Sequence, residues 1–498
     1  MSKKLIYDIG DRPPFGKMLI FAFQQFLAIL AATIAVPTII GLPTQIPAAI
    51  FGAGVGTLIY QLFTKSKSPV FLGSSFAFLG SLGVALTYGY CGILFGSIVA
   101  GLVYVVLAIL IRFVGTKWIT ALMPPVIIGP TVMLIGLSLA GNAMGDIVKA
   151  NSAPQMYQSY NLAALACGFV AFFVIIICSV QKRFVMPKLI PFVIGIGAGY
   201  LVASILTVIG LLADIEYIKI INWQPLVNNF VDADGAFRGV SAFFTIPKFA
   251  IVESVKELMS GNMSSEIMQA SGGAASVITW SGAAEVAIAF LPVALVVFAE
   301  HIADHKNLSA IIGQDLIEEP GLSRTLLGDG VGSIAGTAFG VCPNTTYGES
   351  VGCVAVTRNA STATITVTAV MCMILAFFSP LTIALQTIPS CVMGGVCLTL
   401  YGFIAISGLK MFKHIDLESN KNLFVVASIL IAGIGGLTIQ IPYALAEGGA
   451  IAKTIQITSI ATALILGIVT NKVLTGIEKG KLGQEKNEEK TETNSEEK

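Results

Sequence analysis

The chain has 498 residues, of which 55% are hydrophobic and 11% are charged, with a net charge of +1. Its mean hydropathy is +0.84 and it contains 51 glycines. These values exclude a soluble globular protein and indicate a polytopic membrane protein. We therefore expect a lipid bilayer around it and no nucleic-acid partner.

Fourteen segments are apolar and long enough to be candidate membrane spans, because a spanning helix needs about 20 mainly apolar residues. The start of the chain is too polar to be a cleaved signal peptide. The spans form two groups of seven, at 15–40, 46–63, 69–88, 90–112, 118–140, 161–180, 189–212, and at 281–303, 326–342, 345–357, 361–382, 390–409, 422–440, 452–471.

The positions of Lys and Arg test this count, because these residues collect in short cytoplasmic loops. The loops at 41–45, 86–91 and 383–389 carry neither residue. If both termini are cytoplasmic and the chain crosses the membrane at each of the fourteen spans, the loops that carry the following basic residues also lie in the cytoplasm: Lys65, Lys67, Arg112, Lys117, Lys182, Arg183, Lys188, Lys306, Arg324, Arg358, Lys410, Lys413. We therefore predict a multi-pass protein of the cell (inner) membrane with cytoplasmic N- and C-termini.

Two longer segments lie outside the predicted spans. Residues 213–280 carry seven acidic and four basic residues, which suits an extracellular or periplasmic connection. The end of the chain, residues 472–498, alternates Lys and Glu without apolar periodicity. That pattern predicts a disordered cytoplasmic tail.

The third span of each group is a poor helix. Pro69 and Gly73 interrupt "SPVFLGSSFAFLGSLG", and Pro343 and Gly348 interrupt "GVCPNTTYGESVGCVAV". Interrupted segments at matching places in two halves point to a transport site between inverted repeats. Unwound backbone is tolerated at membrane depth where it lines a cavity. The alternative is that these small residues only let helices approach closely.

The end of the eighth span concentrates ionisable residues in "FAEHIADHKNL". Glu300 and Asp304 are four residues apart and share one helix face, while His301 and His305 share another, turned by about 100°. We assign Glu300 to a site, Asp304 to its rim and His305 to the membrane interface. His301 is either a packing residue or a ligand.

Asp329, in "LLGDGVGS", is a further buried-acid candidate. It could alternatively cap the ninth helix. The cysteines and histidines show no metal-ligand spacing. We therefore expect no metal, no cofactor and no enzymatic activity.

The motifs "AEHIADH", "GLSRTLLGDG", "PNTTYGESVGCVAVTR" and "GSSFAF" resemble those of the nucleobase-ascorbate transporter family, also called nucleobase:cation symporter-2. Within that family "NTTYGE" is most similar to the uracil permease branch. The resemblance implies an all-α protein with 14 transmembrane segments as 7+7 inverted repeats and short extended breaks in spans 3 and 10. It also implies proton-coupled uptake of a nucleobase and a possible homodimer.

The resemblance further implies a division of the chain into two domains that move against each other. A core domain would comprise 15–115 and 281–383, and a gate domain 116–212 and 384–471. Residues 213–280 would connect the two halves of the chain.

Residue by residue, the resemblance implies that Glu300 and Glu349 hold the base. The backbone N–H groups of Phe76 and Gly348 would meet its carbonyl oxygens, with Ser75 and Tyr347 adjacent. The resemblance also makes Asp329 a required acid.

Three departures from the family pattern leave the base open. Asp304 stands where some uracil permeases have His, Ser350 replaces a usual Asn, and Gln25 replaces a His common in the family. Uracil is the expected substrate, and xanthine or uric acid is the alternative.

Uracil offers two N–H donors and two carbonyl acceptors, which two carboxylates and two backbone N–H groups would satisfy. Burial and mutual repulsion favour a proton on one of the facing acids, and we expect Glu300, Asp304 or Asp329 to carry it. An anion carrier of related inverted-repeat fold is the more distant alternative, because inward-facing acids repel anions.

Overall fold

The computed structural model describes residues 5–445 and 451–496 of the chain, and most of them are helical. Within these residues nine helices are long and apolar enough to cross a membrane. They are α1 (Phe15–Ile39), α2 (Ile46–Phe63), α4 (Gly89–Val114), α6 (Pro125–Ile147), α8 (Leu162–Val180), α10 (Pro191–Leu212), α14 (Trp280–Ile312), α19 (Ser390–Lys410) and α21 (Ser459–Glu496). The protein is therefore a multi-pass membrane protein.

Shorter helices lie between these long ones. Three apolar stretches, residues 76–86, 362–375 and 420–434, are helical but below spanning length. The shorter α-helices are α3 (Leu79–Leu86), α5 (Lys117–Leu122), α7 (Gln155–Gln158), α9 (Val185–Leu189), α11 (Gln224–Phe230), α12 (Ala250–Ser260), α13 (Ser265–Ala270), α15 (Leu322–Phe339), α16 (Gly348–Thr357), α17 (Thr362–Leu375), α18 (Ser379–Gln386) and α20 (Asn420–Ile434).

The two interrupted segments meet as strands. β1 (Leu72–Ser74) pairs antiparallel with β2 (Asn344–Thr346), and all six residues are buried. The 3-10 turn Phe76–Phe78 that leads into α3 follows β1, and α16 follows β2. Gly73 is required here, because a Cβ on it would lie 2.3 Å from the ring of Tyr347. The pairing thus brings the N-terminal ends of two helical segments together inside the protein.

Twelve of the α-helices pack as two sets. One set contains α1, α2, α4, α14, α15 and α17, and the other contains α6, α8, α10, α19, α20 and α21. Contacts recur reciprocally between the two halves of the chain: α4 packs on α15 as α17 packs on α2, and α8 packs on α19 as α20 packs on α6. This reciprocity is expected of two repeats related by a pseudo-two-fold axis.

Three predicted span boundaries differ from those in the structure. The span expected at 118–140 begins instead at Pro125, as α6, and α5 is a separate short helix. Proline lacks the N–H and suits the first position of a helix, which explains this start. The spans expected at 422–440 and 452–471 lose their facing ends to a hairpin of β3 (Ile439–Leu445) and β4 (Ile451–Ile457).

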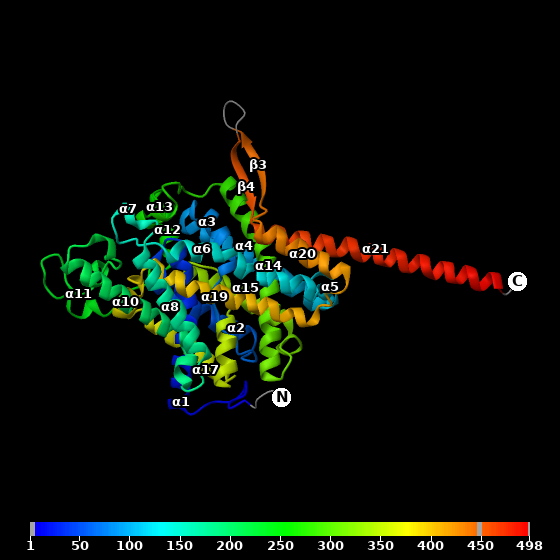
Figure 1. The fold of residues 1–498 in the computed structure, drawn as a ribbon, viewed down its shortest axis with the longest axis horizontal. Coiled ribbons are helices and arrows are strands. Elements are labelled where there is room, and N and C mark those ends of the chain that lie inside the picture. The colour runs from blue at the N-terminus through cyan, green and yellow to red at the C-terminus, as the bar shows by residue number, and fades with distance from the viewer. Residues whose placement is uncertain (1–4, 446–450, 497–498) are drawn as a thin grey trace.

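The sequence did not predict this hairpin, because parts of both strands are apolar enough to be included in the two expected spans. Gly436 adopts a φ of +71° just after α20, which stops the helix, and the following "TIQIP" alternates polar and apolar residues as a strand does. Figure 1 shows the hairpin projecting from the helical body beside α14.

The end of the chain also differs from expectation. The tail expected to be disordered at 472–498 is helical to Glu496, as a continuation of α21 that extends away from the body in Figure 1. Lys, Glu and Gln are good helix formers, so the segment can be helical without an apolar face.

The connection 213–280 is docked onto the ends of the helices. The Glu257 carboxylate accepts the backbone N–H of Tyr90 at 2.8 Å and of Ser264 at 3.3 Å. Glu266 accepts from the Thr44 hydroxyl at 2.7 Å and pairs with Lys248. Burial raises the pKa of Glu257. Residues 248–266 of this connection are therefore folded against the first helix set, whereas Tyr217 and Trp223 bond to α8 and α10 of the second set or to the residue before α8.

Candidate substrate-binding cavity

A cavity of about 540 Å³ lies between the two helix sets. It is lined by α14, by the strand β2 and start of α16, and by residues of α9, α10 and α19. Six of the residues singled out from the sequence line it: Phe76, Glu300, Asp304, Tyr347, Gly348 and Glu349. Ser75 and Asp329 are buried nearby but are not among its lining residues.

One face of α14 forms a wall of the cavity. Glu300 and Asp304, one helical turn apart, both line it, as the four-residue spacing predicted. The Thr346 hydroxyl donates to Asp304 Oδ2 at 2.7 Å. Glu300 Oε2 is buried and has no hydrogen-bond partner among the residues that the structure describes. Because an unpaired buried carboxyl oxygen is unfavourable, Glu300 is the group most in need of a ligand hydrogen-bond donor.

The start of α16 faces this wall. Gly348 and Glu349 are the first two residues of the helix, and a Cβ built on Gly348 would lie 3.8 Å from Asp304 Oδ1. The first N–H groups of a helix have no partner within the helix and carry the positive end of its dipole. The cavity thus combines helix N–H donors with three carboxyl groups.

The aromatic side chains of Phe76 and Tyr347 line the cavity. The Tyr347 hydroxyl donates to the Ser74 carbonyl oxygen at 3.2 Å and lies 3.4 Å from the Thr33 hydroxyl. The Phe76 ring meets the Tyr401 ring edge to face at 5.5 Å. These fixed rings offer flat apolar surfaces suited to a planar ligand.

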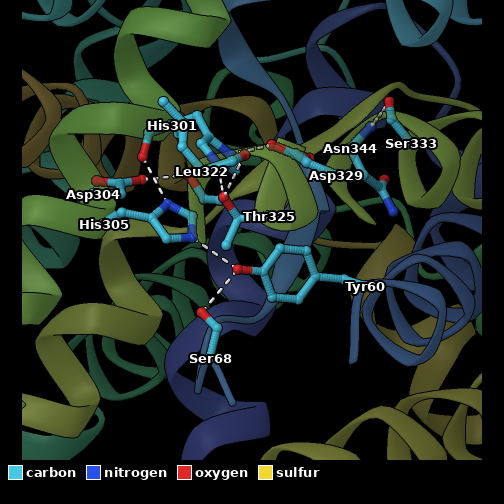
Figure 2. Close-up of polar contacts among 11 residues, drawn as sticks. Tyr60, Ser68, His301, Asp304, His305, Leu322, Thr325, Asp329, Ser333 and Asn344 are labelled. Atoms are coloured by element: carbon cyan, nitrogen blue, oxygen red, sulfur yellow. Dashed lines mark hydrogen bonds and ion pairs between the residues drawn. The ribbon is translucent and has the colours of Figure 1, made fainter. Parts of the chain in front are cut away.

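The other face of α14 carries a hydrogen-bonded network that does not line the cavity (Figure 2). His301 Nδ1 lies 2.7 Å from Asp329 Oδ2, and His301 Nε2 lies 3.0 Å from the Thr325 hydroxyl. His305 Nδ1 donates to the His301 carbonyl oxygen at 2.7 Å, and its Nε2 lies 2.7 Å from the Tyr60 hydroxyl. Both imidazoles and the Asp329 side chain are fully buried.

Two expected positions are corrected by this geometry. Asp304 lies within the cavity wall and is only 4% exposed, rather than at a rim. The helix α14 continues to Ile312, nine residues beyond the expected end at 303, and His305 within it is 0% exposed. The position of His305 at the membrane interface stays a prediction. Asp329 lies in the middle of α15, which begins at Leu322, so it does not cap that helix.

Several residues at the cavity were not found from the sequence. Asn307 lies seven residues after Glu300 and lines the cavity, so helical periodicity could have found it. Thr346, Lys188 and Lys410 belong to other elements and carry no local signal. Gln25, on α1, donates to the Ser350 hydroxyl at 2.6 Å, so two departures from the family pattern contact each other.

No group of three or more His, Cys, Asp or Glu residues within 5–445 and 451–496 is placed to hold a metal ion.

Comparison with known proteins identifies relatives of the whole chain. Residues 16–441 match the model of the xanthine and uracil "Permease family". The chain is 34% identical over 476 residues to a uracil permease of Bacillus caldolyticus, which covers 95% of each chain. It is 30% identical over 473 residues to the uracil permease of Escherichia coli (strain K12), which covers 94% of this chain and 96% of that one.

Solved structures share the fold at low sequence identity. The structure of SLC26A9 matches with a TM-score of 0.56 at 10% identity, over 94% of this chain and 66% of that one. The transmembrane domain of the cyanobacterial bicarbonate transporter BicA matches with a TM-score of 0.52 at 12% identity, over 93% of this chain and all of that one. Together with the family match, these comparisons show that the chain is a membrane transporter and belongs to the nucleobase-ascorbate transporter family.

Proposed function

We propose that this protein imports uracil together with a proton across the cell membrane. The observation that carries the proposal is the unpartnered carboxyl oxygen of Glu300 in a cavity that also contains Glu349 and the N-terminal end of α16. The relatives named uracil permeases support the choice of substrate.

The cavity offers what uracil needs. Its two ring N–H groups would donate to Glu300 and Glu349, and its two carbonyl oxygens would accept from the backbone N–H groups of Phe76 and Gly348. Ser75 and Tyr347 would support this geometry from behind the strands. A mismatched buried polar group costs about 1 to 3 kcal/mol, so full pairing favours uracil over bases with a different donor pattern.

Proton coupling follows from the same acids. Three carboxyl groups line the cavity, and ionised acids in close proximity repel one another. Of the candidates, Asp304 accepts from Thr346, and Asp329 Oδ2 pairs with His301. Among the described residues, Glu300 Oε2 and Asp329 Oδ1 have no partner, and of these two acids only Glu300 lines the cavity. We therefore assign the transported proton first to Glu300, then to Asp304 and Asp329.

Transport would proceed by alternating access between two domains in a chain of fourteen spans. The first helix set corresponds to the core, 15–115 and 281–383, and the second to the gate, 116–212 and 384–471. The cavity lies where the two sets meet, so a movement of one set against the other would expose it alternately to the two sides. A homodimer would hold the gate domains still while the cores move.

The orientation has both termini in the cytoplasm and residues 213–280 outside. A cysteine introduced at Asn228, which is exposed, should react with an impermeant thiol reagent added to intact cells. Labelling of a cysteine in the C-terminal tail instead would contradict the fourteen-span topology.

The substrate is tested by competition. Uptake of labelled uracil should be driven by an inward proton gradient, and unlabelled uracil should compete best among a panel of bases. If xanthine or uric acid competes better than uracil, the second substrate class that Asp304 suggests replaces it. An anion carrier, as the fold neighbours' names suggest for those proteins, is disfavoured by the three acids in the cavity.

A further inference from the structure

The cavity is much longer than one pyrimidine ring. Its lining residues on α14 run from Glu300 through Asp304 and Asn307 to Ile311. The eleven residue-to-residue steps between Glu300 and Ile311 correspond to about 16 Å of helix at 1.5 Å per residue. The acids occupy only the inner part of this length, so the outer part is available to a different chemical group.

The outer part of the cavity is basic. Lys188 and Lys410 line it, and Lys410 also lines an adjoining second cavity together with Lys306. Neither Lys188 nor Lys410 forms an ion pair with any residue in the part of the chain that the structure describes. Asp315, which also lines the second cavity, accepts the Ile317 N–H at 2.8 Å. Two unpaired ammonium groups therefore face an opening whose far end is acidic.

We propose that this cavity also binds a pyrimidine nucleoside monophosphate from the face that carries Lys188 and Lys410. The inference rests on the proposed function, because the base would occupy the position proposed for uracil. The phosphate would meet the two lysines, since Lys is a common phosphate-binding side chain. Asn307, whose amide donates to the Ser407 hydroxyl at 3.0 Å, lies at the same end and would complete the surroundings of the phosphate together with Ser407.

Such a ligand would inhibit transport rather than be carried. A phosphate monoester carries a charge of about −1.5 to −2 at pH 7, which makes transfer through the acidic, membrane-embedded part of the cavity unfavourable. The ribose also replaces one ring N–H, so the nucleotide loses one of the proposed bonds to an acid. The nucleotide is the product class formed when an imported base is joined to a ribose phosphate. Binding would therefore slow import when that product accumulates.

The test uses the full-length protein in vesicles with its cytoplasmic face outward, and measures exchange of labelled uracil with uridine 5′-monophosphate added outside. We expect competitive inhibition by the nucleotide. Inhibition by uridine, which lacks the phosphate, or by ribose 5-phosphate, which lacks the base, should be at least tenfold weaker. The double variant Lys188→Gln with Lys410→Gln should weaken nucleotide inhibition at least tenfold with little change in the KM for uracil. Lys413→Gln, a nearby lysine that lines neither cavity, is the matched control.

The outcomes separate this inference from the proposed function. If the wild-type protein exchanges no uracil, the proposed function is wrong. If it exchanges uracil but the nucleotide inhibits no better than uridine, or the double variant remains equally sensitive, the inference alone is wrong. A variant effect that appears only in vesicles with phosphatidylglycerol would assign the lysines to lipid headgroups and also overturn the inference.

Discussion

The two faces of α14 differ in how completely their ionisable groups are paired. The face with Glu300 and Asp304 borders the cavity, and Glu300 Oε2 has no partner. The face turned by about 100° carries His301 and His305, and every nitrogen of both rings has a partner. One face of the helix therefore carries an unpaired carboxyl oxygen in a cavity, and the other carries two imidazoles whose nitrogens all have partners.

This difference distinguishes residues that take part in transport from residues that stabilise the fold. A fully bonded buried network specifies one packing arrangement, whereas an unpaired group inside a cavity is stabilised only when a donor arrives. Loss of a cavity-face group should therefore change transport, and loss of a rear-face group should change stability.

The largest effect is expected for Glu300→Gln. The amide can still accept a hydrogen bond but cannot take up and release a proton, so accumulation of uracil against its gradient should be lost. Proton-driven uptake in vesicles measures this, with Glu285→Gln at the other end of α14 as the control. Concentrative uptake at the wild-type level would move the proton to Asp304 or Asp329.

A smaller but clear effect is expected for Glu349→Gln. At this position the amide would present both a donor and an acceptor to the base, which weakens the match to a ring N–H. Uracil transport, measured as kcat/KM, should fall at least tenfold, or about 1.4 kcal/mol. Glu349→Asp serves as the control that keeps the charge, and unaltered uracil uptake by the Gln variant would favour the purine class of substrate.

A rear-face change should affect stability alone. Tyr60→Phe keeps the ring but removes the hydroxyl that lies 2.7 Å from His305 Nε2 and 2.8 Å from Ser68 Oγ. The loss should destabilise the protein by about 1 to 3 kcal/mol, because a buried ring nitrogen is left unpaired.

Thermal unfolding of the purified Tyr60→Phe variant measures the loss. Its uracil uptake per folded molecule and its proton dependence should match the wild type. A changed ratio of net uptake to exchange would show that the rear face takes part in coupling, and the contrast between the two faces would be lost.

The smallest effect is expected for Glu257, a hydrogen-bonded acid outside the membrane spans, on the pH dependence of stability. Burial raises the pKa of Glu257, with the N–H groups of Tyr90 and Ser264 opposing that shift. A raised pKa in the folded state means that the docked connection binds the proton more readily than the unfolded chain does. The wild type should therefore gain stability relative to Glu257→Gln as the pH falls toward the raised pKa, and lose it as the pH rises.

Thermal unfolding of the wild-type and Glu257→Gln proteins between pH 5 and pH 8 measures this difference. A difference that is independent of pH would show that the Glu257 carboxyl does not titrate across this range.

At the site, the sequence could predict only those features that depend on a short stretch of the chain. Periodicity placed Glu300 and Asp304 on one face of a helix and the two histidines on another, and the structure shows both pairs on those faces. The burial of Asp304 and His305 inside the protein was not predicted, because the span was expected to end at residue 303, whereas α14 continues to Ile312. Partners such as Thr346 and Tyr60 make those charged and polar groups compatible with burial, and they lie far away in the sequence.

The sequence by itself determined the membrane class, the approximate positions of the long helices and the two interrupted segments, because hydropathy, helical period and Pro or Gly content are properties of short stretches. Only the tertiary structure decided that β1 pairs with β2, that Asp329 meets His301, and that two lysines share a cavity with three acids. These contacts join residues from separate helices, and their distances depend on how the helices pack rather than on any local pattern.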